Sequence, residues 1–277
     1  MSNGCCAPAL RGLLAALCLV PALAGAAPAA DAVQLEALTS TELRQRVAAG
    51  ATTILVPLGG TEQNGPHMVL GKHNVRVRVF AELIARELGN ALVAPVMAYV
   101  PEGSIEPPAA HMRYAGTISI PDAAFEAVLE GAARSFRRHG FREVVFLGDH
   151  GGYQKSEERV AAKLNREWAA AGGTPCRVHA LKEYYRASQE GHAALLAARG
   201  FKADEIGTHA GLADTALALA ADEALVRPEW LGRSSTPAER PGVSGDPRRA
   251  TVALGRIGVE HIVEVSVSAI RERTRPR

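Results

Sequence analysis

A carboxylate, an amide and two imidazoles follow an apolar run near residue 60. The run spans 54–58, and a glycine pair ends it before Glu62, Asn64, His67 and His73. This pattern is typical of a buried strand that ends in a polar loop, where α/β folds place their chemistry. Oxygen and nitrogen donors of these types suit divalent zinc, manganese or iron. The segment therefore predicts part of a metal site.

A second polar segment follows another apolar run, at 143–147. Asp149 and His150 come directly after it, and Gly151 and Gly152 follow. Because the carboxyl ends of parallel strands meet at one edge of a sheet, the two segments could converge on one crevice. A plain glycine turn that hydrogen-bonds the histidine would have the same sequence, so both interpretations stay open.

Three further residues could contribute from other parts of the chain. His209 precedes a predicted helix, and Asp214 lies in its early turns, where the helix dipole favours a carboxylate. An aspartate there is often only a helix-terminus charge. His111 lies in a loop, where a lone histidine is more often structural than catalytic. Taken together, the segments make four side chains candidate metal ligands: Glu62, His73, His150 and Asp214.

Strand-like and helix-like segments alternate along the chain. We expect strands at 52–58, 91–96, 143–147 and 176–181, and helices at 74–88, 122–139, 153–171, 212–225 and 259–273. Such alternation predicts an α/β fold with three layers, α/β/α, and a mostly parallel central sheet. The segment 234–249 is rich in Pro, Gly and Ser, and we expect a surface loop that could cover a site.

The N-terminus has the pattern of a secretory signal peptide. Arg11 precedes the apolar run 13–20, and the small residues Ala24, Gly25 and Ala26 follow, which predicts cleavage after Ala26. The run is shorter than the roughly 20 residues that a membrane-spanning helix needs. We therefore expect a signal peptide at 1–26, a single α/β domain at 27–277, and an exported protein, periplasmic or secreted, without stable membrane insertion.

The composition limits the classes of partner and the disulfides that we expect. The chain has 31 Lys and Arg residues against 29 Asp and Glu residues, and no basic stripe with interleaved aromatics, so a nucleic-acid partner is not expected. Cys176 is the one cysteine beyond the predicted signal peptide, which excludes an intramolecular disulfide framework there.

The order of the segments resembles that of the creatininase family of metal-dependent amidohydrolases. The resemblance covers nearly the whole predicted mature chain and rests on motifs at 57–67, 116–120, 146–152, 209–215 and 242–251. It implies a three-layer domain, a homo-oligomer, and one or two divalent metals that activate water against a C–N bond.

The resemblance also shows departures at the site. Asn64 stands where the family has a metal-binding histidine, and His73 stands where it has a bridging aspartate. Gly152 stands where the creatinine-cleaving members have a glutamate, although other members also have glycine there, and Asp214 replaces a longer acid. Two cations need anionic bridges to offset their repulsion. We therefore predict one divalent metal per chain, zinc, manganese or iron, with ligands drawn from Glu62, His73, His150 and Asp214.

The expected function is metal-dependent hydrolysis of an amide or cyclic amide C–N bond in a small molecule other than creatinine. In this scheme Asp149 or Asp214 accepts the proton of water, and His209 protonates the leaving nitrogen. A metal- or ligand-binding exported protein without turnover, and a lyase or isomerase, remain as alternatives. The residues expected to contact substrate or support the ligands are Asn64, His67 and His111.

Overall fold

The computed structural model describes residues 1–2, 32–172, 175–231 and 241–275. The predicted signal peptide and its cleavage point lie outside the described residues, apart from the first two, so they stay predictions. The chain divides into two compact units, Met1–Asp31 and Ala32–Arg277, and the second contains the sheet and its helices. Among the described residues, no helix combines the length and the apolar character needed to cross a membrane.

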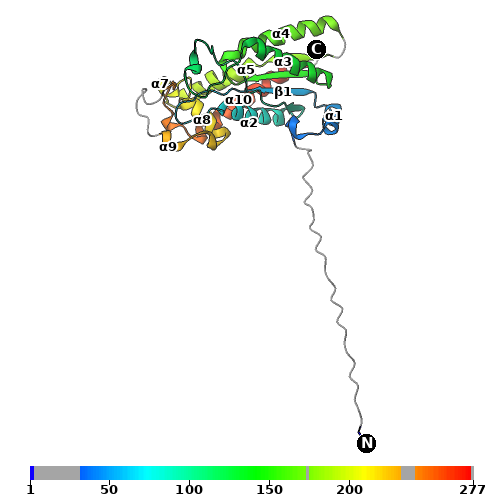
Figure 1. Ribbon diagram of the computed structural model, residues 1–277, viewed down its shortest axis with the longest axis horizontal. Coiled ribbons are helices and arrows are strands. Elements are labelled where there is room, and N and C mark those ends of the chain that lie inside the picture. The colour runs from blue at the N-terminus through cyan, green and yellow to red at the C-terminus, as the bar shows by residue number, and fades with distance from the viewer. Residues whose placement is uncertain (3–31, 173–174, 232–240, 276–277) are drawn as a thin grey trace. The chain divides into compact units, whose positions relative to one another are not determined.

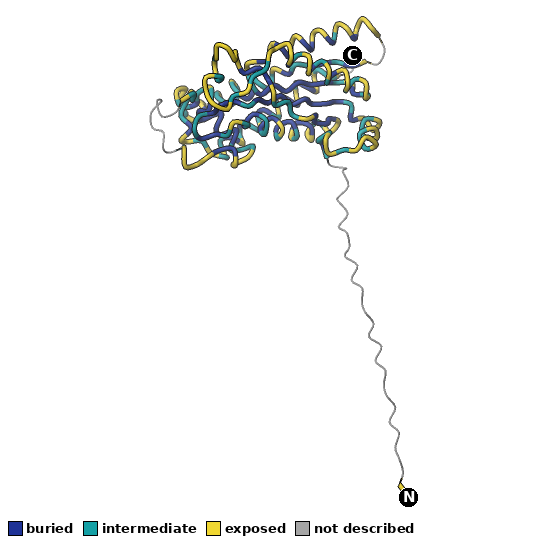
Figure 2. Tube along the Cα trace, viewed as in Figure 1, coloured by how far each residue is buried: buried dark blue, intermediate teal, exposed yellow. Residues whose placement is uncertain are grey.

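A parallel four-stranded sheet forms the centre of this unit. Its strands are β1 (Thr53–Leu58), β2 (Ala91–Val93), β3 (Glu143–Gly148) and β4 (Arg177–Ala180), in the order β2-β1-β3-β4. β1 is buried along its whole length, as expected for a central strand covered on both faces (Figure 2). β1 and β3 pair from their first to their last residues, so their carboxyl ends lie side by side.

Helices cover both faces of the sheet (Figure 1), which confirms the predicted three-layer α/β/α fold. Ile54 and Phe146 point into a core with Phe125 and Leu164, and Leu55 points into the opposite core. The first face carries α1 (Ser40–Ala48), α3 (Asp122–Arg138) and α4 (Gln154–Ala171), and the second carries α2 (Lys72–Leu88), α5 (Lys182–Arg186) and α10 (Val252–Arg273). α8 (Leu212–Ala221) packs against α10 and α2.

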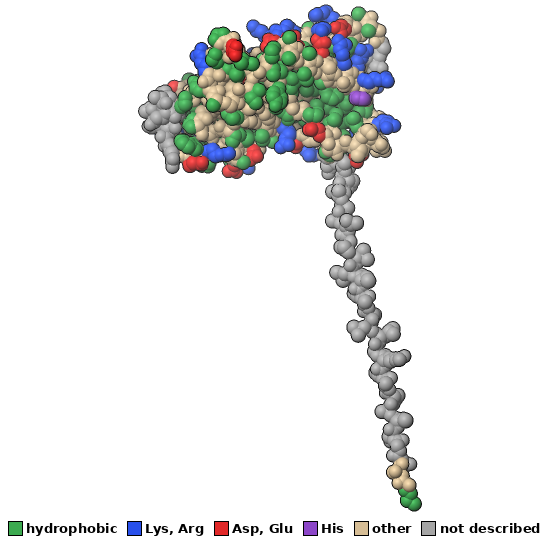
Figure 3. All heavy atoms as spheres, viewed as in Figure 1, with side chains coloured by type: hydrophobic (Ala, Val, Ile, Leu, Met, Phe, Trp, Pro, Cys, Tyr) green, Lys and Arg blue, Asp and Glu red, His purple; other side chains and the backbone are tan. Residues whose placement is uncertain are grey.

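Shorter elements connect these helices. They are α6 (His192–Ala197), α7 (Ala203–Ile206), α9 (Pro228–Leu231), a π-helical turn at Ala187–Gly191, and 3-10 turns at Leu35–Ala37, Ala110–Arg113, Gly151–Tyr153, Glu223–Leu225 and Pro247–Arg249. Salt bridges cross the exposed surface between α3 and α4, where basic and acidic atoms interleave along the upper edge of Figure 3. Exposed pairs of this kind contribute little to stability.

Four boundaries differ from the sequence prediction by two or more residues, and one of them is the end of the helix expected at 212–225, which lies at Ala221. The helix expected from residue 74 begins at Lys72, after Gly71, so His73 lies in its first turn and not in the preceding loop. The last helix begins at Val252 and not at residue 259, because the Thr251 side chain caps it by accepting the Leu254 N–H. Gly255 and Gly258 lie in its first turns, and because glycine has a low helix propensity the sequence pattern did not indicate this start. The strand expected at 91–96 ends at Val93.

Those two glycines allow α10 to approach its neighbours closely. A Cβ at Gly255 would lie 1.9 Å from the Ala216 carbonyl oxygen of α8, and one at Gly258 would lie 2.7 Å from the His192 ring. A side chain at either position would therefore separate the helices.

We predict that Gly255→Ala lowers the free energy of unfolding by about 1–3 kcal/mol, because the close backbone contact outweighs the helix propensity of alanine. Gly131→Ala on α3 is the matched control, since a Cβ there meets nothing within 4 Å. The control should gain up to about 1 kcal/mol. Urea unfolding followed by circular dichroism checks both, and equal stabilisation by the two substitutions would contradict the packing argument.

Candidate metal centre

Polar side chains gather at the carboxyl edge of β1 and β3. The Asp149 N–H donates to the Leu58 carbonyl at 3.1 Å, which continues the pairing of the two strands beyond the sheet. The Tyr153 hydroxyl then donates to the Gly59 carbonyl at 2.6 Å and accepts from the His150 N–H at 3.1 Å. The loop after β1 and the loop after β3 are thus held side by side, as the sequence predicted.

A fully buried arginine links three elements beneath this edge. Arg76 on α2 lies within 2.8–2.9 Å of Asp149 Oδ2, and its Nη1 lies 2.6 Å from Asp214 Oδ1 on α8. Lys72 Nζ and the Ala210 N–H donate to Asp214 Oδ2. Burial alone would raise the pKa of both aspartates, but these cations lower it, so both carboxylates are ionised.

His73 lies between two carboxylates. Its Nε2 is 2.7 Å from Glu62 Oε1, and its Nδ1 is 2.6 Å from Asp149 Oδ2. Because an ionised carboxylate only accepts, both hydrogen bonds form together only when both ring nitrogens carry protons. In this arrangement His73 has no lone pair for a metal, so the geometry favours an ion-pairing role over the predicted ligand role.

Glu62 is the centre of the candidate site. Its side chain is fully buried, and Oε2 has no hydrogen-bond partner among the described residues. His111 Nε2 and His150 Nε2 lie 3.6 and 3.7 Å from Oε2, and His209 Nδ1 lies 3.7 Å from Oε1. Burial would raise the pKa of Glu62, but the hydrogen bond and charge of His73, with Lys72 and His150 nearby, lower it well below its usual range.

Two groups among the described residues have donor atoms that fit one metal ion. Glu62 with His111 and His209 forms one, and Glu62 with Glu102 and His150 forms the other, with donor atoms within 4.8 Å of one another. A buried carboxylate oxygen without a partner is costly unless a cation or a proton neutralises it. The donor set therefore fits a divalent cation next to Glu62 Oε2.

The tautomer of His209 follows from its partner. Its Nε2 lies 2.9 Å from the Gln63 carbonyl oxygen, so Nε2 carries the proton and Nδ1 presents a lone pair toward Glu62. Burial lowers the pKa of His209 to about 4, which keeps the ring neutral near pH 7. A neutral His209 can therefore accept a proton at Nδ1 before it delivers one.

His111 has the opposite arrangement. The Gln63 side chain accepts the Gly65 N–H through its oxygen and donates through its nitrogen to the Gly242 carbonyl and to His111 Nδ1. A neutral His111 therefore carries its proton on Nε2, the atom that faces Glu62 Oε2. Gln63 therefore sets the proton positions of both rings, so that His111 can donate and His209 can accept toward Glu62. The two ring centroids lie 4.1 Å apart.

Glu102 is a site residue that the sequence analysis missed. It follows β2 in a proline-rich loop, its exposed fraction is 3%, and neither carboxylate oxygen has a hydrogen-bond partner in the described part of the chain. His150 Nδ1 lies 3.3 Å from Glu102 Oε2 but accepts the Gly152 N–H. Burial, with the charge of Glu62, raises the pKa of Glu102 to about 9. The strand-end rule that indicated Glu62 and His150 did not indicate this residue, because it lies well beyond Val93, the last residue of β2.

The remaining predicted site residues lie around this cluster. Asn64 Nδ2 donates to the Glu62 and Val69 carbonyls at 2.9 and 3.1 Å and so shapes the loop. His67 Nε2 lies 3.0 Å from Thr215 Oγ1 and connects the loop to α8. Both oxygens of Asp149 and of Asp214 already accept hydrogen bonds. The geometry therefore favours positioning roles for the two aspartates over the predicted role as proton acceptor.

A cavity of about 600 Å³ adjoins the candidate ligands. Glu102, His111, His150 and Gly152 line it together with Ile120. Among the described residues no lysine or arginine lines it, so a small substrate would meet the two imidazoles and the carboxyl groups of Glu102 and Asp122.

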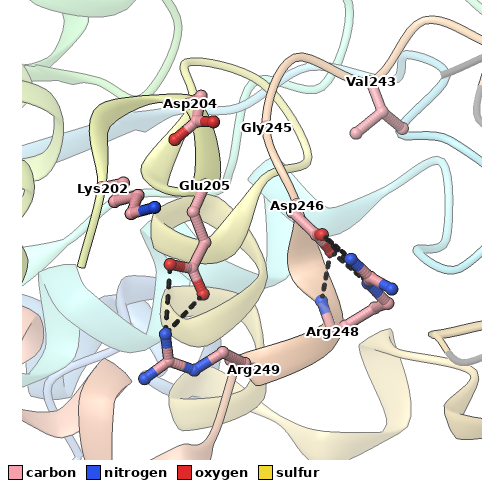
Figure 4. A pocket seen from close by; sticks show the side chains of 8 residues that line it. All are labelled: Lys202, Asp204, Glu205, Val243, Gly245, Asp246, Arg248 and Arg249. Carbon is pink, nitrogen blue, oxygen red and sulfur yellow. Dashed lines mark hydrogen bonds and ion pairs between the residues drawn. The ribbon is translucent and has the colours of Figure 1, made fainter. Parts of the chain in front are cut away.

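A second cavity, of about 700 Å³, lies near the segment after residue 241 (Figure 4). Its acidic and basic side chains pair with each other, Arg249 with Glu205 and Arg248 with Asp246. In the described part of the predicted 234–249 loop, Ser244 forms an antiparallel bridge with His209. The described part of that loop therefore borders the site, and two of the arginine–carboxylate pairs of the second cavity neutralise each other.

Comparison with known proteins agrees with this geometry. The creatininase family profile, described as creatinine amidohydrolase, matches residues 36–270. The chain belongs to the creatininase family. The match covers most of the chain, so the resemblance expected from the motifs is confirmed.

Individual members of the creatininase family show how far the likeness extends. The mycofactocin precursor peptide peptidase of Mycobacterium tuberculosis is 30% identical over 80% of this chain and 84% of that enzyme. The enzyme of the same name from Mycolicibacterium smegmatis is 35% identical, over 45% of this chain and 50% of that enzyme. A solved creatininase variant in its Zn–Zn form is 26% identical, with a TM-score of 0.72 over 88% of this chain and 99% of that one.

We predict that Arg76→Met lowers the free energy of unfolding by about 3–5 kcal/mol, because it leaves two buried aspartates without their shared cation. The matched control is Arg134→Met, which removes an exposed arginine paired with Glu167. The control should leave the unfolding midpoint nearly unchanged. Guanidinium chloride titrations of both variants check this, and an equally small effect of Arg76→Met would contradict the proposed link.

Proposed function

We propose that this protein is a metal-dependent hydrolase that cleaves an amide C–N bond in a small molecule or peptide. The observation that carries the proposal is Glu62 Oε2, which has no hydrogen-bond partner among the described residues and belongs to a group with Glu102 and His150 whose donor atoms fit one metal ion. Its relatives include a peptidase and a creatininase, and both names denote hydrolysis at a C–N bond. The site lies at the sheet edge beside a cavity that can admit substrate.

Glu62 and His150 would hold the metal, since both belong to the donor groups and both match the family motif. When bound, a divalent zinc, manganese or iron ion polarises a carbonyl and lowers the pKa of water. Amide hydrolysis also needs one proton taken from water and one delivered to the leaving nitrogen. The His209 Nδ1 lone pair is placed to take a proton and later return it, and the His111 Nε2–H can donate to the substrate.

One metal per chain agrees with the charges around the site. Lys72 Nζ lies 3.9 Å from Glu62 Oε1, and His73 occupies the same oxygen. These protein cations approach Oε1, whereas His111 and His150 face Oε2, so a second divalent ion beside Oε1 would meet positive charge at short range. We therefore retain the prediction of one metal per chain.

We predict that purified protein supplied with Zn²⁺ or Mn²⁺ binds one equivalent per chain and hydrolyses members of a panel of small amides and short peptides. Glu62→Ala should lose both properties, because it removes the residue common to both donor groups. Elemental analysis and an amine-release assay measure the two. Unchanged hydrolysis by Glu62→Ala, or two bound equivalents in the native protein, would contradict the scheme.

We also propose that the chain is exported, with the signal pattern at 1–26 as support. Expression of the full chain in a Gram-negative host should give a periplasmic product whose N-terminal sequence begins at Ala27. Recovery of the chain with residues 1–26 intact would contradict export by cleavage. Assembly into a homo-oligomer stays a prediction from the family.

A further inference from the structure

Glu102 is buried beside Glu62 with no cation between them. Glu102 Oε1, Glu102 Oε2 and Glu62 Oε2 have no hydrogen-bond partner among the described residues. Carboxylates at the surface form hydrogen bonds with water, but Glu102 is only 3% exposed and Glu62 is fully buried. Two buried acids next to each other are stable together only with a proton or a cation between them.

Gly60, which follows β1, leaves space for the Glu102 carboxylate. Gly60 has a φ of +150°, and a Cβ on it would lie 2.2 Å from Glu102 Oε1. Only glycine both adopts this backbone conformation easily and leaves that space. The carboxylate therefore occupies a place shaped for it at the end of β1.

Gly152 lies beside the same edge of the His150 ring as Glu102. It stands where the family resemblance places a glutamate in creatinine-cleaving members, so this chain lacks an acid at that position. A Cβ on Gly152 would lie 3.1 Å from the His150 ring and from the Pro101 carbonyl, the residue before Glu102. Glu102 thus brings a carboxylate to the same histidine from a different loop.

We propose that Glu102 is a metal ligand of this protein and supplies the acidic ligand that is missing at Gly152. Glu62, Glu102 and His150 would then hold the ion, next to the cavity that Glu102 and His150 line together with His111 and Ile120. The inference rests on the proposed metal-dependent function and adds one residue to it. It places one ligand on the loop after each of three adjacent strands, β2, β1 and β3.

The test is calorimetric titration of chelator-treated protein with ZnCl₂ alone, so no substrate is needed. Glu102→Gln should weaken zinc binding by about 100-fold or more, and Glu102→Asp by less. Glu106→Gln is the matched control, an exposed glutamate in the same loop, and should bind as the native protein does. Gly60→Ala should weaken binding as Glu102→Gln does, because it displaces the carboxylate.

A compensating substitution and a thermal melt separate ligation from structure. Gly152→Glu added to Glu102→Gln should restore zinc affinity to within about tenfold of native, since it returns an acid to His150. The metal-free Glu102→Gln protein should melt at or above the native temperature, because the carboxylate has no partner to lose.

Native affinity in Glu102→Gln, with binding lost in Glu62→Ala, would overturn the role of Glu102 and leave the proposed function standing. Absence of zinc binding in the native protein would overturn the proposed function itself. A metal-free Glu102→Gln protein that melts well below native would indicate a structural role and would also overturn the proposal.

Discussion

The buried guanidinium of Arg76 is the interaction on which the site depends. Transferring an arginine into the interior is costly, and the cost is offset only by close partners with good geometry. Asp149 comes from the end of β3, and Asp214 comes from the first turn of α8. One side chain on α2 therefore fixes the relative positions of the sheet edge and two helices. The same helix then directs Lys72 and His73 at Glu62.

This arrangement divides the charges of the site into two sides. On the helix side, Lys72, Arg76 and His73 form hydrogen bonds to the carboxylates of Glu62, Asp149 and Asp214. On the cavity side, Glu62 Oε2 and both oxygens of Glu102 have no hydrogen-bond partner among the described residues, and imidazole nitrogens lie near them. A protein that neutralises one side with its own cations and leaves unpartnered carboxyl oxygens on the other side is prepared for a single added cation. This explains how a family member can lack a histidine at Asn64 and a bridging aspartate at His73.

Much of the fold followed from local patterns. The apolar runs before Gly59 and Asp149 predicted β1 and β3, and the same-edge rule for parallel strands correctly brought the loops after them together. Glu102 was missed because it lies well beyond Val93, the last residue of β2, whereas Glu62 and His150 follow their strands within a few residues. Lys72 and Arg76 were missed because cations on a helix normally face solvent, and only tertiary contacts show that these two are buried.

Residue type alone could not assign roles within the cluster. His73 was predicted as a ligand because imidazole binds metals well, but its two carboxylate partners come from residues 11 positions before it and 76 positions after it. His209 and His111 have the same side chain and opposite proton positions, set by the backbone and the amide of Gln63. Such distinctions depend on distances between residues far apart in sequence, which no local pattern encodes.

Anomalous X-ray diffraction from crystals of the zinc-loaded protein, recorded on both sides of the zinc edge, is the most direct test. The account predicts one anomalous peak per chain, in contact with Glu62, Glu102 and His150 at the mouth of the cavity. His73 should remain between Glu62 and Asp149 without contact to the metal. A peak bonded to His73 or Asp214, or no peak at this edge of the sheet, would contradict the account.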